Sequence, residues 1–359
     1  MTATLVPAPD LATLLSVEEM EQVAKARLPV ASYAYVASGS GAEVTLRANR
    51  AAFSRWAFRP RVLVNVKDRD LSTTVLGAKI DLPVLVAPYA LQCLLDLEGE
   101  VATARAAGGA GTVMALSMGS TRTIEDVAGA ATRPLWFQPY LFDDLGIVRE
   151  VIARAEAAKY AAICLTLDSP VIGYREAQIR TPAVLPDGVT WANMPAEIQT
   201  GKRRWLSGAS WDWDTLDRIR SATRLPIVLK GILTAEDARL AVEHGAAAIV
   251  VSNHGGRQLD GSVASLDALP EVVAAGGGRA EVLLDGGIRR GTDVLTALAL
   301  GARAVLIGRA AAWGLAVGGQ AGVERVLQLL RDELSTSMAI VGAPTLDRIT
   351  REHVTRMTV

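Results

Sequence analysis

Eight short apolar runs, each followed by a segment with helical periodicity, constrain the fold of this 359-residue chain more than any other feature. Most runs are continuously apolar, as in parallel strands buried on both faces. Eight strand–helix units in succession predict an α/β protein, a (β/α)8 TIM barrel. A doubly wound sheet gives a similar pattern, but no Gly-x-Gly-x-x-Gly opens a helix after the first strand. The runs are 83–89, 112–117, 135–140, 161–170, 226–231, 247–253, 281–287 and 303–309.

Two regions lie outside the eight repeats. Residues 1–80 carry helical periodicity and a linker, and predict an N-terminal helical extension. Residues 176–210 form an insert between the fourth and fifth strands, with Pro, Gly, Trp and the basic trio Lys202 to Arg204. Such a connection over the active face of a barrel is often a mobile lid, but it could also be a variable surface loop. We expect a single domain over 1–359, although this length could hold two.

The composition argues against several function classes. With 37 basic and 38 acidic residues the formal net charge is −1, so we expect no nucleic-acid partner. Cys93 and Cys164 lie far apart without a CxxC motif, which predicts no metal cluster and no disulfide framework and favours a cytoplasmic protein. The N-terminus lacks the basic segment of a signal peptide, and no apolar stretch is long enough for a bilayer, so we expect no membrane association.

Polar side chains follow seven of the eight apolar runs, at the ends where barrels hold their active sites. Because the carboxyl ends of all eight strands meet at one mouth, these groups should converge there. A barrel that served only as a scaffold would not need them. They are Ser117, Gln138, Tyr140, Thr166, Asp168, Lys230, Ser252, His254, Arg257, Asp285, Arg289 and Arg309; the first run ends in Pro88, Tyr89 and Ala90.

The last two strand ends predict a phosphate site. The segments 285–289 and 308–309 place glycines and arginines where barrels commonly bind phosphate, and glycine lets backbone N–H groups approach an anion. The glycines could instead serve only as tight turns. Lys230 follows four apolar residues, so its ammonium should be buried and should face an anion, since a buried unpaired charge is costly.

Four motifs together resemble the FMN-dependent 2-hydroxy acid oxidases and dehydrogenases, a family that includes glycolate, lactate and hydroxymandelate oxidases. The motifs are SNHGGRQLDG at 252–261, LTLDSP at 165–170 followed by GYRE, LPIVLKGILTAEDA at 225–238 and LLDGGIRRGTDVLTALALGA at 283–302. The resemblance extends from LPVASYAYVASGSG near the N-terminus to LLRDELSTSMAIVG near the C-terminus. It implies FMN as cofactor and a small 2-hydroxy acid as substrate.

The resemblance also implies a role for each matching residue. It assigns catalysis to His254, Asp168, Lys230 and Tyr140. It assigns substrate binding to Tyr35, Tyr140, Arg175, His254 and Arg257. It assigns the flavin ring to Pro88, Tyr89, Ala90, Ser117, Gln138, Thr166, Lys230 and Ser252, and the phosphate and ribityl chain to Asp285, Gly286, Gly287, Ile288, Arg289, Gly308 and Arg309. Tyr35 and Tyr140 could also be ordinary core residues, and Asp168 a helix cap.

The chemistry explains why these residue types are needed. Guanidinium groups bind a carboxylate in a planar fork, so Arg175 and Arg257 can fix a 2-hydroxy acid in one orientation. Oxidation requires a proton to leave the hydroxyl, and histidine is the natural base near neutral pH, which assigns that role to His254. Asp168 would orient the imidazole, and Lys230 would stabilise negative charge on the reduced flavin. Whether hydride transfer or carbanion formation occurs stays open.

The chain departs from the family pattern at several positions. LDLEGE at 95–100 stands where many members have HPEGE, and Tyr174 stands where glycolate oxidases often have a second arginine. Tyr89 replaces a residue that is often threonine, and the insert is shorter than in glycolate oxidase. Gly119 stands where glycolate oxidase has a tryptophan that fills the substrate pocket, which predicts a medium or large aryl or alkyl 2-hydroxy acid. Trp191, Trp205 or Tyr89 could instead fill that space.

Three functions remain open at this stage. The favoured one is oxidation of an (S)-2-hydroxy acid to a 2-oxo acid, with O2 as the electron acceptor and H2O2 as the product. Ala90, beside the expected flavin N5, matches oxidases better than dehydrogenases that pass electrons to a quinone or a protein. A barrel isomerase acting on a phosphorylated ligand without net redox is the alternative of another class. By analogy with relatives we expect a homotetramer or homo-octamer.

Overall fold

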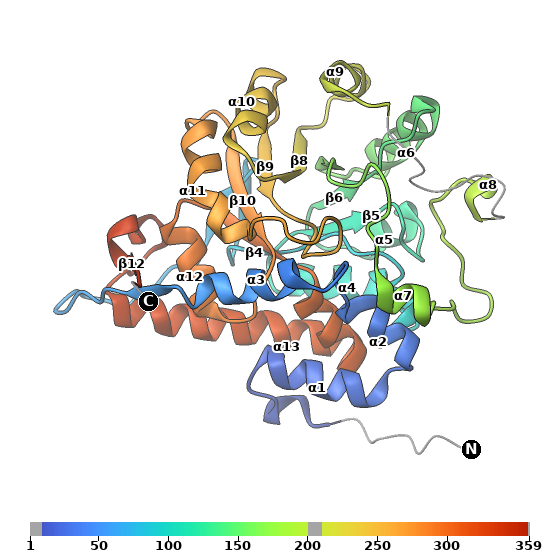
Figure 1. Ribbon diagram of the computed structural model, residues 1–359. Helices are drawn as coiled ribbons and strands as arrows, with labels where there is room; N and C mark the ends of the chain where they lie inside the picture. Colours follow the sequence, from blue (N-terminus) through green and yellow to red (C-terminus); the bar gives the residue numbers. More distant parts are fainter. Residues whose placement is uncertain (1–8, 200–209, 358–359) are drawn as a thin grey trace.

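The centre of the molecule is a closed barrel of eight parallel strands, seen in a computed structural model that describes residues 9–199 and 210–357 (Figure 1). The strand order is β10-β11-β4-β5-β6-β7-β8-β9, and the last strand in sequence, β11, pairs with the first, β4. The predicted (β/α)8 barrel is therefore confirmed, because a doubly wound sheet stays open. The strands are β4 (Val84–Val86), β5 (Met114–Ser117), β6 (Leu135–Gln138), β7 (Ala162–Thr166), β8 (Ile227–Ile232), β9 (Ala248–Val251), β10 (Glu281–Asp285) and β11 (Ala304–Ile307).

Helices cover the outside of the barrel (Figure 1). The longest, α13, is kinked at Gly318 and Gly319 and packs against α4, α12 and the N-terminal helix α1 (Val17–Arg27). None of the helices in the described part of the chain combines the length and the apolar character that a bilayer crossing requires. The barrel helices are α4 (Glu100–Gly109), α5 (Ile124–Ala130), α6 (Leu145–Ala157), α9 (Trp213–Arg220), α10 (Ala235–Glu243), α11 (Ser265–Gly276), α12 (Gly291–Ala299) and α13 (Arg309–Val341).

A hairpin of two short strands, β2 (Thr73–Val75) and β3 (Ala78–Ile80), closes one end of the barrel. Val75 and Ile80 belong to the buried cluster that fills the barrel interior, and the turn between the strands bonds Glu281 at the start of β10. The amino-terminal end is thus packed shut. This leaves the carboxyl ends of the strands for a ligand.

The N-terminal segment is helical as far as Phe53. After η1 (Leu11–Thr13), α1 packs on α13, α2 contacts α7 in the insert and α3 contacts α11. The predicted linker that follows holds three short strands that the sequence did not reveal. One of them, β1 (Trp56–Phe58), pairs with β12 (Val354–Arg356), so its partner lies at the other end of the chain. The helices are α1 (Val17–Arg27), α2 (Val30–Ala37) and α3 (Val44–Phe53).

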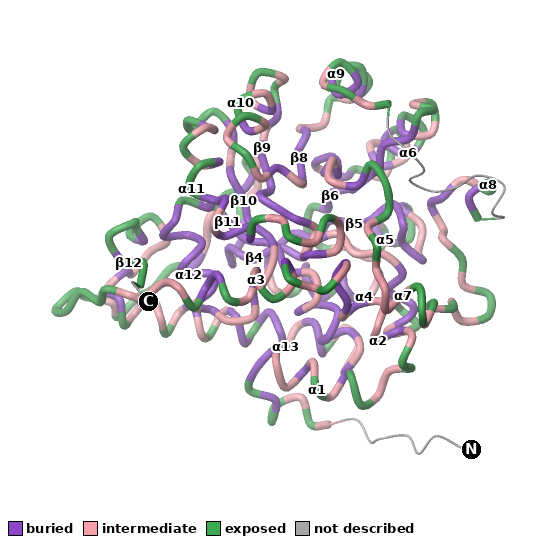
Figure 2. The backbone as a smooth tube through the Cα atoms, in the orientation of Figure 1, coloured by how far each residue is buried: buried purple, intermediate pink, exposed green. Residues whose placement is uncertain are grey.

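The connection between β7 and β8 contains the insert predicted over 176–210. It holds two short helices, α7 (Glu176–Arg180) and α8 (Ala196–Gln199), and most of its described residues are exposed or partly exposed (Figure 2). The basic trio Lys202 to Arg204 and Trp205 lie outside the described residues. The role of the insert as a lid stays a prediction.

Candidate active site

One cavity of about 360 Å³ opens at the carboxyl ends of the barrel strands. All five residues expected to bind substrate line it: Tyr35, Tyr140, Arg175, His254 and Arg257. So do most of those expected to bind a cofactor: Pro88, Tyr89, Ala90, Lys230, Asp285, Gly286, Gly287, Ile288, Arg289, Gly308 and Arg309. The volume falls in the range of small-molecule sites, roughly 300–1,000 Å³.

Five expected site residues lie behind this lining. Asp168 does not line the cavity but forms a hydrogen bond with His254, which does. The Ser252 hydroxyl accepts a hydrogen bond from Lys230 Nζ at 2.9 Å. The other three, Ser117, Gln138 and Thr166, are buried at the ends of their strands. Their side chains therefore belong to the same layer of strand ends without forming its exposed surface.

His254 and Asp168 form a hydrogen-bonded pair. Nδ1 of His254 lies 2.8 Å from Oδ1 of Asp168, and Nδ1 is 3.4 Å from the hydroxyl of Ser169. This leaves Nε2 as the ring nitrogen for a ligand in the cavity. The arrangement is that of a general base held by a carboxylate.

Burial and charge set the protonation of this pair. Burial lowers the pKa of His254; Asp168 opposes this effect, whereas Lys230 and Arg175 add to it. Burial alone would raise the pKa of Asp168, but the charge and hydrogen bond of His254, together with Lys230, lower it. Asp168 is therefore ionised and His254 is neutral near pH 7, which is the state a base requires.

The backbone of His254 has a left-handed conformation, with φ of 59°. This conformation is costly for a side chain larger than glycine and has to be held by its surroundings. The Ser252 hydroxyl accepts from His254 N–H at 3.0 Å, and Asn253 Oδ1 accepts from Gly256 N–H at 3.0 Å. The Asn253 amide also exchanges two hydrogen bonds of 2.8 Å with that of Asn49 on α3. The N-terminal extension thus fixes the histidine loop.

Arg257 lies beside the pair with no carboxylate partner among the described residues. Its guanidinium donates to the carbonyls of Tyr35 at 2.8 Å and Ser38 at 3.0 Å, and it lies over the ring of Tyr35 at 5.3 Å. Burial, reinforced by the positive charges of Arg175 and Arg309, lowers its pKa well below the usual value. An anion in the cavity would relieve this cost.

Lys230 forms a buried ion pair with Asp285. Nζ lies 3.0 Å from Asp285 Oδ2, and both side chains are under a tenth exposed. Burial alone would lower the pKa of Lys230, but Asp285 and Asp168 outweigh burial and raise it, so the ammonium is charged. The other oxygen, Asp285 Oδ1, is buried with no hydrogen-bond partner in the described structure, which leaves an acceptor for a ligand donor.

The expected phosphate end of the cavity is formed by glycine backbone and two arginines. Gly287 has φ of 88°, and a Cβ there would lie 2.3 Å from the Asn49 carbonyl, so only glycine fits. Burial lowers the pKa of Arg289, and burial together with Arg289 lowers the pKa of Arg309 to about 10. Helix α13 begins at Arg309, so its N-terminus lies at this end of the cavity. Two positive charges and a helix N-terminus suit a dianionic phosphate.

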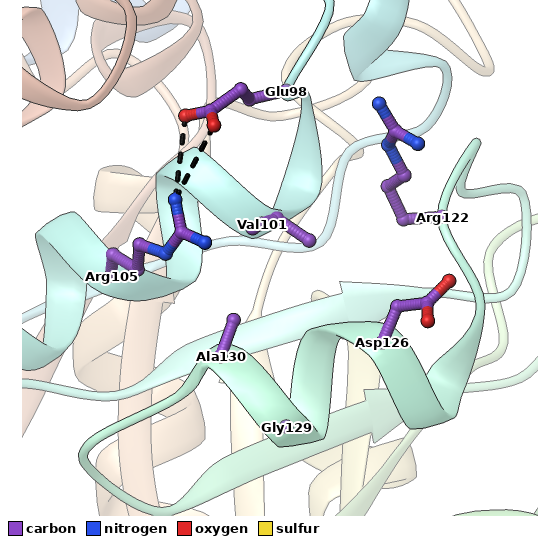
Figure 3. A pocket seen from close by; sticks show the side chains of 7 residues that line it. All are labelled: Glu98, Val101, Arg105, Arg122, Asp126, Gly129 and Ala130. Atoms are coloured by element: carbon purple, nitrogen blue, oxygen red, sulfur yellow. Dashed lines mark hydrogen bonds and ion pairs between the residues drawn. The ribbon is translucent and has the colours of Figure 1, made fainter.

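A second cavity, of about 450 Å³, lies between α4 and α5 on the outside of the barrel (Figure 3). Glu98 and Arg105 pair within it at 3.4 Å, so part of its charge is already compensated. None of the residues expected at the strand ends lines it; its lining is Glu98, Val101, Arg105, Arg122, Asp126, Gly129 and Ala130. The chemistry therefore belongs to the mouth of the barrel.

Several residues that shape the mouth were not predicted. Asn253 and Gln258 belong to the SNHGGRQLDG motif, and this membership could have identified them as residues of the site. Asn49 gave no signal, because its partner lies 204 residues away. Ile172 and Gln178 line the cavity from the β7–β8 connection.

Comparisons with known proteins agree with this geometry. The family model described as FMN-dependent dehydrogenase matches residues 24–356. The chain is 52% identical to L-lactate oxidase from Nostoc sp. over 347 residues, covering 92% of this chain and 95% of the relative. It is 47% identical to glycolate oxidase from Spinacia oleracea over 352 residues, covering 95% of each.

Solved structures give the same result. A mandelate oxidase variant with (S)-mandelic acid superposes with a TM-score of 0.90 at 41% identity, covering 97% of this chain and 100% of the other. A variant of an active chimera of (S)-mandelate dehydrogenase superposes with a TM-score of 0.91 at 36% identity, covering 96% and 100%. The likeness therefore includes the whole barrel and its strand ends.

Proposed function

The chain belongs to the FMN-dependent dehydrogenase family, and from this premise we propose that it oxidises an (S)-2-hydroxy acid to the 2-oxo acid with O2 as electron acceptor. Its relatives include lactate, glycolate and mandelate oxidases, which supports the general reaction. The observation that carries the proposal is the His254–Asp168 pair, 2.8 Å apart, whose imidazole lines the same cavity as Arg257, a residue with no carboxylate partner among the described residues. A base and a carboxylate anchor are what this substrate class needs.

The residues of the mouth fit FMN. Arg289 and Arg309 would hold the phosphate, and Gly286 and Gly287 line the same cavity. Asp285 offers a buried, unpartnered oxygen to a donor on the cofactor. When bound, FMN supplies the two-electron acceptor for the C2–H bond of the substrate. Lys230 would place a positive charge beside it.

The chain's own groups orient the substrate and take its proton. Arg257, with Arg175, binds the carboxylate, which directs the hydroxyl toward His254. Nε2 of His254 accepts the hydroxyl proton, and Asp168 stabilises the imidazolium that results. Tyr35 and Tyr140 contact the same cavity and complete the substrate side.

Anaerobic mixing with 2-hydroxy acids tests this function. The purified protein should be yellow, and its flavin absorbance should bleach when a substrate is added without oxygen. A panel of 2-hydroxy acids then ranks the substrates. A colourless protein, or a flavin that no 2-hydroxy acid bleaches, would refute the proposal.

The proposal also specifies O2, and not a quinone or a protein, as the electron acceptor. Ala90 lines the cavity, and relatives are named as oxidases of lactate, glycolate and mandelate, whereas one solved structure is a chimera of (S)-mandelate dehydrogenase. Stopped-flow mixing of the reduced protein with oxygen should give fast reoxidation and H2O2. Slow reoxidation, with fast reduction of a quinone, would favour the dehydrogenase alternative.

The proposal further specifies the size of the substrate. Gly119 is buried in the loop after β5, where it has no side chain that could extend toward the cavity, so we propose a medium or large aryl or alkyl 2-hydroxy acid. Trp191 and Tyr89 both line the cavity and represent the competing possibility, that another side chain occupies this space. Competition between substrates of different size decides between them.

We also propose a cytoplasmic homotetramer or homo-octamer. Both cysteines are buried and free, as a reducing compartment permits. Val62 and Leu63 are almost fully exposed in the segment between β1 and β2, and a second copy could cover them. Light scattering on the holoprotein measures the assembly, and a monomer would refute this part.

A further inference from the structure

The side chain of Gln258 connects two loops that carry the substrate groups. Gln258 lies on the loop after β9, and all its side-chain hydrogen bonds go to the loop after β7. Nε2 donates to the carbonyls of Asp168 at 2.8 Å and Val171 at 2.9 Å. Oε1 accepts from Gly173 N–H at 3.1 Å and from Arg175 Nη2 at 3.1 Å.

These four bonds use the full capacity of a glutamine amide, two donors and two acceptor sites. Only one orientation of the amide satisfies them. Turning it over would place NH2 against two donors and the oxygen against two carbonyls. The hydrogen bonds of Gln258 therefore depend on one orientation of its amide group.

Apart from Gln258, single hydrogen bonds hold the loop after β7, among them Gly41 N–H to the Tyr174 carbonyl at 2.8 Å and Arg175 Nε to the Arg257 carbonyl at 2.9 Å. Between β7 and α7 it forms no regular helix or strand, and Val171, Ile172 and Tyr174 are more than half exposed. It approaches the other loop most closely at Gly173, where a Cβ would lie 2.4 Å from the Arg257 carbonyl. Loss of the Gln258 amide would remove the principal polar link at this junction.

Arg175 depends on this junction more than Arg257 does. The described partners of its guanidinium are the Arg257 carbonyl at 2.9 Å and Gln258 Oε1. Arg257 is held independently by two carbonyls of the N-terminal extension. The same glutamine bonds the carbonyl of Asp168, which orients His254.

We propose that Gln258 is a positioning residue that aligns Arg175 with the His254–Asp168 pair, so that carboxylate binding and proton removal act on one bound acid. This rests on the proposed function. Gln258 does not line the cavity and acts through Arg175.

A double-mutant cycle on the FMN-loaded protein tests the proposal. Pyruvate and phenylglyoxylate serve as 2-oxo acid probes, and their Kd is read from the change in flavin absorbance. Gln258→Ala should raise Kd by about ten- to hundredfold, the range of a hydrogen bond to a charged group. In an Arg175→Ala background the same change should alter Kd by less than about threefold, because the group it positions is gone.

Two further variants keep the test independent of folding. Gln258→Met preserves the length of the side chain without its hydrogen bonds and should lose affinity as Gln258→Ala does. Gln328→Ala, which removes an exposed amide on α13, should leave Kd unchanged.

Unchanged binding in Gln258→Met, or equal losses with and without Arg175, would overturn the assignment. If the native protein gave no response to any 2-oxo acid and no bleaching by any 2-hydroxy acid, the proposed function would fall, and this assignment with it. A native response that the Gln258 variants keep would overturn the assignment alone.

Discussion

The two sides of the barrel mouth differ in how they are built. On the side of the loop after β9, Asn253 and Asn49 are buried and exchange two amide hydrogen bonds, and the buried Ser252 hydroxyl accepts from His254 N–H. On the side of the β7–β8 connection, Ile179 and Val184 are more than half exposed (Figure 2). The difference indicates that the proposed base, His254, is held on a fixed frame together with Arg257, whereas Arg175 and Trp191 stand on a less constrained segment. Catalytic geometry tolerates little error, and substrate fit tolerates more.

The largest expected effect comes from removing the base on the fixed side. His254→Ala should slow flavin reduction by roughly 10²–10⁴-fold, the usual contribution of a positioned acid–base group. FMN content should stay close to that of the native protein, since Arg289, Arg309 and glycine backbone form the expected phosphate end. Anaerobic stopped-flow measures the rate, and reduction at the native rate would end the assignment of His254 as the base.

Changes at Arg257 should act on binding. An ammonium cannot make the planar two-point contact, so Arg257→Lys should weaken 2-oxo acid binding despite the conserved charge. Arg257→Ala should cost about 2–5 kcal/mol of binding free energy, as for a buried charge pair. Titration of the flavin spectrum gives both values. Native affinity in the lysine variant would contradict a forked contact.

The contrast between the two sides should also appear in stability. Asn49→Ala removes both hydrogen bonds between Asn49 and the buried Asn253 amide, and the one that Asn49 Oδ1 accepts from Ser265 N–H, and should reduce the free energy of unfolding by about 1–3 kcal/mol. Gln178, on the insert side, donates to the Tyr35 carbonyl at 3.1 Å, and Gln178→Ala should change stability by only about 0.5 kcal/mol. Urea unfolding of the two holoproteins measures this, and equal losses would remove the distinction.

The pH dependence follows from the lowered pKa of His254. The base must be neutral to accept a proton, and burial keeps it neutral to a lower pH than an ordinary histidine. The acid limb of kcat/KM should therefore lie below about 6.5, and the rate should fall about tenfold per pH unit below that limb. Asp168 opposes the lowering, so Asp168→Asn should move the limb further down. A limb above 7 would contradict this environment.

The sequence was sufficient to predict the barrel and its strand ends. In a (β/α)8 barrel the residue that follows a strand lies at the mouth whatever the exact packing, so chain order alone placed Lys230, His254 and Asp285 together. The buried Lys230 was expected to face an anion, and it pairs with Asp285. Local pattern was enough because the architecture repeats.

Contacts between distant segments could not be predicted in this way. The Asn49–Asn253 pair and the β1–β12 pairing join residues more than 200 positions apart, and nothing local marks either partner. The β2–β3 hairpin is local, but its strands of three residues are too short to show a period of two, and only Gly77 marks the turn, where Leu76 and Gly77 both have positive φ. The structure of the insert could not be predicted, because its described residues show no periodic apolar pattern. Individual hydrogen bonds hold them instead, such as that from Gln178 Nε2 to the Tyr35 carbonyl.

The smallest expected effect concerns substrate size and the less constrained side. Trp191 lines the cavity, and its neighbours tie the insert to the loop after β5: Ala192 N–H donates to the Ser120 carbonyl at 3.0 Å, and Asn193 Nδ2 donates to the Ser120 hydroxyl at 2.7 Å. This holds Trp191 beside the loop of Gly119. If the space left by Gly119 is open, mandelate and 2-hydroxyoctanoate should exceed glycolate in kcat/KM at one oxygen concentration.

Trp191→Ala should then raise the ratio of mandelate to glycolate by a further three- to tenfold. About 60 Å² of extra apolar burial at roughly 25 cal/mol per Å² corresponds to about 1.5 kcal/mol, or about tenfold. Trp213→Ala is the matched control, because Trp213 stacks on His244 at 5.2 Å and does not line the cavity. A native preference for glycolate that Trp191→Ala reverses would mean that Trp191 fills the space. A preference that neither variant changes would mean that the fixed side of the mouth also sets substrate size, and the contrast between the two sides would fail.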